Sequence, residues 1–151
     1  MSRRIVLSGV AGVVVLAGAG AFALAYAGDQ APALAHSTAR YTAPAAGRDG
    51  SLAFSTDVTV SSGVKSVKVV AWPANSSFAK KGLTAKEMAA TVESADCTPS
   101  GGDSERCTYK VPVTRADAEG SPKGLWHVAV LVTAKDGDTT LDTKAADFTV
   151  A

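Results

Sequence analysis

The sequence is poor in the residues that most often carry chemistry. Its 151 residues include two cysteines and two histidines, and aromatic residues make up 6%. Cys97 and Cys107 are not in a C-x-x-C pair and have no nearby histidine, which disfavours a zinc or redox site. No G-x-S-x-G motif occurs, so the sequence offers no recognisable serine nucleophile. These absences predict a protein that is not an enzyme and that uses no metal or other cofactor.

An excess of charge of one sign is also lacking. The chain has 15 Lys+Arg against 14 Asp+Glu. Loss of an N-terminal segment containing Arg3 and Arg4 would leave 13 basic against 14 acidic residues, a net charge of −1. This balance gives no electrostatic case for binding nucleic acid or an anionic membrane surface.

The N-terminal residues have the layout of a secretory signal peptide. Two arginines precede an uncharged apolar run from Ile5 to Ala25, and small-residue A-x-A sequences follow at 25–27 and 33–35. We therefore predict a signal peptide over residues 1–27. The same residues loosely resemble a twin-arginine export signal, which is an alternative export route.

The two A-x-A sequences leave two sites for cleavage, after Ala27 or as late as Ala35. Either would release a secreted protein, extracellular or associated with the cell envelope, with no membrane contact in its mature form. The alternative is an uncleaved N-terminal anchor, since about 20 apolar residues can span a bilayer.

The rest of the chain predicts a flexible leader followed by one β-domain. Residues 28–48 are rich in Ala, Pro and Gly and contain His36, with an edge strand predicted at 39–42. Residues 49–151 then show short stretches of alternating apolar and polar residues separated by turn-forming residues. The expected strands cover 51–60, 64–72, 91–97, 107–114, 125–134 and 141–150.

The spacing of these strands favours an all-β fold, an immunoglobulin-like antiparallel β-sandwich of about seven strands. The strand beginning at Leu125 is apolar on both faces and is expected to be central. Thr84 and Glu87 form a capping-box pattern that predicts one short helix reaching Ala90. The residues from Arg115 to Gly124 are expected to form a polar connection.

Cys97 and Cys107 flank a polar stretch rich in turn-forming residues. A β-hairpin would bring the two cysteines opposite each other, within the range of a disulfide bond. We therefore predict a structural Cys97–Cys107 disulfide, which also suits a protein exported to an oxidising compartment.

Several stretches resemble known families. "SSGVKSVKVVAWP" and "LWHVAVLVTAKDGDTTLDTKAADFTV" are similar to bacterial immunoglobulin-like modules. Together with "ARYTAP", the cysteine pair and "AWPANSSFAKKGLTAKEMA", they resemble a family of small secreted actinobacterial proteins of unknown function. The resemblance implies export and an immunoglobulin-like fold, and it carries no catalytic residue to this chain.

The sequence Asp136-Gly137-Asp138 is the stretch most similar to a metal site. Oxygen-bearing residues recur at every second position from Asp136 to Asp142, as in a calcium-binding loop. An EF-hand loop needs glycine at its sixth position, where Leu141 stands, and it needs flanking helices. Asp-Gly is a strong hairpin signal, so a turn between two strands is the favoured interpretation.

The predicted function is that of an exported, non-enzymatic binding module. Loops on a rigid sandwich commonly carry recognition, which makes Asn75, Phe78, Lys80 and Lys81 the candidate binding loop. Trp72 is expected in the core, with an exposed aromatic platform as the alternative. The expected partner is an extracellular protein or a cell-wall component.

Two other functions remain open. One is a secreted protease inhibitor that uses the Cys97–Cys107 loop, and the other is an unrecognised enzyme.

Overall fold

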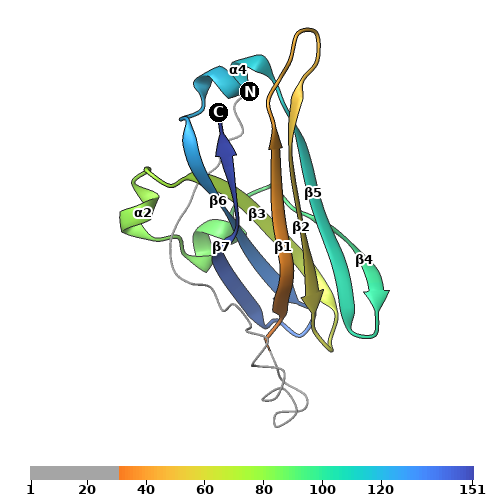
Figure 1. The fold of residues 1–151 in the computed structure, drawn as a ribbon. Helices are drawn as coiled ribbons and strands as arrows, with labels where there is room; N and C mark the ends of the chain where they lie inside the picture. Colours follow the sequence, from red (N-terminus) through yellow and green to blue (C-terminus); the bar gives the residue numbers. More distant parts are fainter. Residues whose placement is uncertain (1–30) are drawn as a thin grey trace.

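The computed structural model describes residues 31–151, and the predicted signal peptide at 1–27 lies outside them. Two antiparallel sheets pack face to face as a β-sandwich (Figure 1). The four-stranded sheet has the order β1 (Ala33–Thr42), β2 (Gly50–Thr59), β5 (Ser104–Val113), β4 (Asp96–Gly101). The three-stranded sheet has the order β3 (Val64–Pro73), β6 (Gly124–Ala134), β7 (Thr139–Val150).

This strand order is that of constant-type immunoglobulin domains, in which the first, second, fifth and fourth strands face the third, sixth and seventh. The predicted β-sandwich is therefore confirmed, with the strand from Leu125 as the sixth strand and the C-terminal strand as the seventh. The disulfide lies elsewhere than in antibody domains, because it joins two strands of one sheet instead of the two sheets.

The core between the sheets follows from alternation along the strands. Leu52, Phe54 and Val58 of β2 are buried toward the three-stranded sheet, and Val60 joins the same cluster, as the alternation predicts. Strand β6 is buried on both faces, with Trp126 and the valines on the inner face and Ala129 and Leu131 on the outer face. It lies between β3 and β7, so its prediction as a central strand is confirmed.

The edge strand predicted at 39–42 within the leader is confirmed as part of β1, but this strand begins earlier, in residues that were expected to be flexible. Strand β1 pairs with β2 from Ala33 to Thr42, so the sheet begins well before residue 49. A tertiary contact explains why these residues form a strand: Leu34 is 5% exposed and packs into the core. His36 also lies in this strand, at a bulge where its φ is +52°, and its Nδ1 is 3.0 Å from the Asp57 carboxylate.

Within residues 31–151, three short helices stand where one was expected: α2 (Phe78–Lys81), α3 (Ala85–Ala89) and α4 (Arg115–Gly120). Helix α3 begins with the predicted capping box of Thr84 and Glu87. The expected polar connection after residue 114 contains α4, capped in the same way by Thr114 and Asp117. Thr-x-x-Asp satisfies the same backbone N–H groups as Thr-x-x-Glu. This pattern was the sequence signal for α4 that the prediction missed.

The strand predicted at 91–97 is displaced along the chain. Residues 93–95 instead lie against the free edge of β3, where Val69 N donates to Glu93 O and Ala95 N donates to Val67 O. The chain then crosses to the other sheet and forms β4 from Asp96 to Gly101. Strand β4 thus continues past Cys97, where the predicted strand ended. It ends at the turn into β5, in which Gly101 and Gly102 have positive φ values.

The turn between β6 and β7 is the Asp136-Gly137-Asp138 stretch, and the hairpin prediction is confirmed. Asp138 N donates to Asp136 Oδ1, Ala134 N donates to Asp138 O, and Gly137 has a φ of +98°. Thr140 and Asp142 are buried in β7, beyond the turn. The oxygen-bearing residues of this stretch are thus divided between a turn and a strand, and do not share one loop.

Within residues 31–151, no helix is both long and apolar enough to cross a membrane.

Candidate functional site

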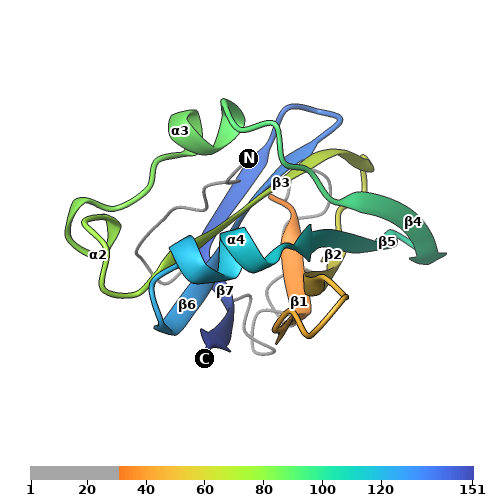
Figure 2. The same cartoon turned by 90° about the horizontal axis from the view of Figure 1, so that it is seen from above.

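The chain between β3 and β4, residues 74–95, lies on the outer side of the three-stranded sheet, and we call it the β3–β4 segment. Figure 2 shows α2 and α3 on this side, away from the four-stranded sheet. Its first residues are held by backbone hydrogen bonds, since Ala74 N donates to Leu125 O and Ser76 N donates to Pro73 O. Its last residues bond to the edge of β3, so the segment is attached to the sheet at both ends.

A second apolar cluster fixes the middle of the segment. Met88 of α3 is 0% exposed and packs with Trp72, Ala129 and Leu131 on the outer face of the sheet. Partly buried side chains of the sheet and of the segment surround them: Val70, Phe78, Leu83 and Leu141. A five-residue helix has little stability of its own, so α3 depends on this burial and on its cap.

Electrostatic contacts join the two helices of the segment. Lys81 Nζ donates to Glu87 Oε1 at 2.5 Å and lies 5.7 Å from the centre of the Phe78 ring. Glu87 also accepts from Thr84 N in the capping box. The hydrogen bond from Lys81, followed by that from Thr84, lowers the pKa of the Glu87 carboxyl below its usual value. Glu87 therefore stays ionised where it caps α3.

The structure places the four predicted binding-loop residues in one short stretch with different roles. Asn75, Lys80 and Lys81 are exposed, whereas Phe78 is partly buried against the apolar cluster. Phe78 thus anchors α2, and the polar residues beside it form the accessible surface. This surface carries two adjacent cationic side chains, Lys80 and Lys81, on a segment that is hydrogen-bonded to the sheet at both ends.

Trp72 is not an exposed platform, so that alternative is wrong. The side chain is 1% exposed, and its Nε1 donates to the carbonyl oxygen of Thr143 at 3.1 Å. The β3–β4 segment covers the face of the sheet on which the indole lies. Trp72 is therefore a core residue of the second apolar cluster, as its favoured interpretation had it.

Sequence reasoning missed a pair of titratable side chains beside Trp72. His127 is 8% exposed, its ring lies 4.5 Å from that of Trp72, and its Nδ1 is 2.5 Å from Asp147 Oδ1. Continuing the pairing from the turn would place Ala145 opposite His127. An irregularity in β7 shifts the pairing and brings Asp147 there instead. The sequence carries no clear signal for that shift.

The His127–Asp147 pair has the hydrogen bond of a catalytic His–Asp dyad, but three functional groups are needed for nucleophilic catalysis. The Trp72 ring packs against the imidazole, with the two ring centres 4.5 Å apart. In the part of the chain that the structure describes, no group of three or more His, Cys, Asp or Glu side chains is placed to hold a metal ion.

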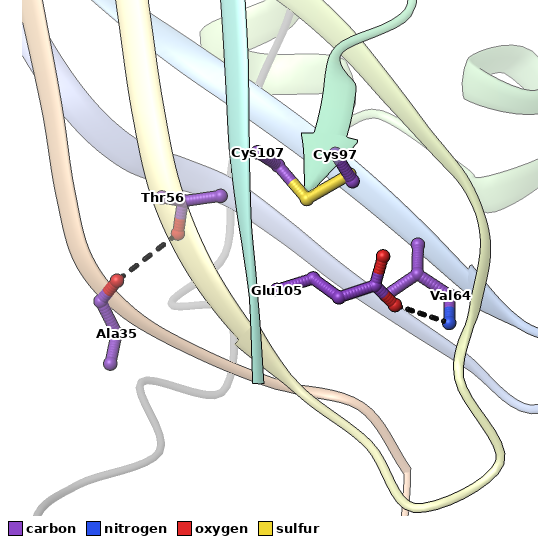
Figure 3. Close-up of a disulfide and its surroundings, with 6 residues drawn as sticks. All are labelled: Ala35, Thr56, Val64, Cys97, Glu105 and Cys107. Atoms are coloured by element: carbon purple, nitrogen blue, oxygen red, sulfur yellow. Dashed lines mark hydrogen bonds between the residues drawn. A yellow bond between two sulfur atoms is a disulfide. The ribbon is translucent and has the colours of Figure 1, made fainter. Parts of the chain in front are cut away.

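The predicted disulfide is confirmed and joins the edge strand β4 to β5 (Figure 3). Cys107 is fully buried in the core, and residues 98–103 beyond the bridge are exposed. Nearby, Val64 N donates to Glu105 Oε2 and ties β3 of the other sheet to β5. The bridged residues form a hairpin in which β4 pairs with β5 and the register shifts between Pro99 and Gly101.

A family model described as "Family of unknown function (DUF5707)" matches residues 34–132. The match covers well over half of the chain, so the protein belongs to this family of unknown function. It begins within β1, which agrees with the inclusion of that strand in the domain, and it includes the whole β3–β4 segment. Neither the curated proteins nor the solved structures searched gave a significant match.

Proposed function

We propose that this protein is exported and acts outside the cytoplasm as a non-enzymatic binding module, with the β3–β4 segment as its binding surface. The observation that carries the proposal is the attachment of this segment to the sheet. Met88 and Phe78 hold it from below, while Asn75, Lys80 and Lys81 face solvent. A surface held in place before binding loses less conformational entropy on binding.

Export is supported by the signal-peptide pattern and by the disulfide. Structural disulfides persist in oxidising compartments and are rare in the cytosol. The partner is an extracellular protein or a cell-wall component that accepts hydrogen bonds and bears negative charge, because the exposed side chains of the candidate binding loop, Asn75, Lys80 and Lys81, are one amide and two cations. The family resemblance points to an actinobacterial source, which determines where to look for the partner.

The proposal is tested by retention of the secreted protein on two fractions from an actinobacterium, insoluble cell-wall material and concentrated secreted proteins. The site variant is Lys80→Ser with Lys81→Ser, which keeps the Phe78 side chain but also removes the hydrogen bond from Lys81 to Glu87, so its urea unfolding is compared with that of the wild type. The matched control is Arg40→Ser with Lys110→Ser. It removes the same charge from the exposed face of the four-stranded sheet, where both residues lie opposite Ala53.

We expect one fraction to retain the wild type and the control, and the site variant to bind about tenfold more weakly, the size typical of two interface side chains. Equal retention of all three proteins would place binding on another face. Retention by neither fraction would count against a binding module.

A secreted protease inhibitor acting through the Cys97–Cys107 hairpin is the second candidate. The exposed residues 98–103 and the bridge at their base favour it. Inhibition of one member of a panel of extracellular proteases, lost on substitution of exposed residues 98–100, would support it over the β3–β4 surface. An unrecognised enzyme is the third, and labelling by a reactive-serine probe would support it.

A further inference from the structure

The two A-x-A sequences at 25–27 and 33–35 imply different mature proteins. Cleavage after Ala27 would leave a chain that begins at Gly28, and cleavage after Ala35 would leave one that begins at His36. The sequence alone does not choose between them, since both provide small residues at the two positions that a signal peptidase reads. The structure of residues 31–35 does distinguish them.

The residues just before Ala35 are part of the folded domain. Pro32 is fully buried, and its carbonyl oxygen accepts a hydrogen bond from Thr140 Oγ1 at 2.6 Å. Leu34 is 5% exposed in the core cluster. Ala33 and Leu34 also pair with Thr59 and Val58 of β2, at the start of the sheet.

Cleavage after Ala35 would remove all of these contacts. The new terminus, His36, would lie inside the bulge between Ala35 and Thr38. Thr140 would lose the acceptor of its buried hydroxyl, and a buried polar group without a partner is costly. The end of β2 would lose its neighbour, which exposes Val58. Cleavage after Ala27 removes none of these contacts.

The same contacts matter if the chain folds before export, as the twin-arginine route requires. In the folded protein the carbonyl oxygen of Ala35 accepts from Thr56 Oγ1, within the paired part of β1 (Figure 3). A peptidase that binds an extended substrate cannot reach a bond whose strand is already hydrogen-bonded in a sheet. On either route, the second A-x-A sequence is a poor site.

We propose that the signal peptidase hydrolyses the peptide bond between Ala27 and Gly28, and that residues 33–35 are a segment of β1 instead of a processing site. Hydrolysis adds one water molecule and leaves a carboxylate on Ala27 and a free amino group on Gly28. The inference rests on the export proposed above, and it defines the N-terminus of the mature module.

The test uses the full chain, produced in a secreting bacterial host, with N-terminal sequencing and intact mass of the protein in the medium. Two matched variants each place a large side chain at the residue before one candidate bond, Ala27→Gln and Ala35→Gln. Ala35 is exposed, so its replacement leaves the core intact.

We expect the wild type and Ala35→Gln to begin at Gly28 with similar yields, and Ala27→Gln to yield about tenfold less processed protein. A wild type that begins at His36 would overturn the inference alone and leave export standing. Secretion of Ala27→Gln at wild-type yield, with His36 as its first residue, would also overturn the inference alone and leave export standing. Full-length protein retained in the cells for all three chains would overturn both export and the inference.

Discussion

Loss of the Cys97–Cys107 disulfide is the perturbation whose size follows most directly from the structure. The cysteines face each other across β4 and β5, with a sequence separation of 10 and a Cα–Cα distance of 4.0 Å. A cross-link that closes a loop of this length restricts the unfolded chain, and the chain-entropy relation gives about 2.7 kcal/mol of stabilisation at 25 °C. Reduction should therefore lower the free energy of unfolding by about that amount.

The reduced protein and the variant Cys97→Ala with Cys107→Ala should differ slightly. Both lose the cross-link, but the variant also loses sulfur atoms, and Cys107 is fully buried in the core. The small cavity left there should cost about 1 kcal/mol more. Comparing the two separates the effect on the unfolded chain from the effect on native packing.

Urea unfolding at neutral pH measures both quantities. With a slope of about 1–3 kcal/mol per M, reduction should lower the midpoint by about 1–3 M. Faster hydrogen exchange in β4 should accompany the loss, because this exposed edge strand pairs only with β5. A midpoint that moves by less than about 0.3 M would refute the entropic reasoning, and would mean that the unfolded chain keeps the hairpin closed.

Three further substitutions test the buried contacts, each by urea unfolding. Leu34→Ala should cost about 2–4 kcal/mol if β1 belongs to the core, whereas a flexible leader would show no change. Trp72→Phe keeps a ring in the cluster but removes the hydrogen bond from the indole to the Thr143 carbonyl, and should cost about 0.5–1.5 kcal/mol. Burial raises the pKa of the Asp142 carboxyl. Its charged form therefore destabilises the native state above that pKa, and the penalty disappears as the pH falls through it. Asp142→Asn, which keeps an acceptor for Lys144 N, should add about 0.5–2 kcal/mol at pH 7, and this gain should shrink in acid; a gain independent of pH would contradict this account.

The candidate site could be predicted in part, because some of its features are local. Asn75, Lys80 and Lys81 are polar residues in an irregular stretch, and Thr84 with Glu87 is a cap readable over four residues. The role of each residue within the site was harder to predict from the sequence. Whether Phe78 is an anchor or a contact residue depends on the sheet below it, which is assembled from strands distant in the sequence.

Local patterns also misplaced some elements for physical reasons. The composition of residues 28–48 suggests a leader, yet Leu34 enters the core because β2 offers it a place there. The stretch at 91–95 looks like a strand, but it meets the edge of β3 before the chain crosses to the other sheet.

The sequence by itself determined the class of fold and the positions along the chain of most of its strands. Apolar residues at every second position specify strands with one buried face, and the doubly apolar stretch at β6 specifies a strand covered on both sides. The tertiary structure alone decided the contacts between distant residues. The irregularity in β7 brings Asp147 to His127, and the packing of Met88 over Trp72 turns a tryptophan at a strand end into core. These contacts depend on the register and on the covering of sheet faces, which short-range patterns do not encode.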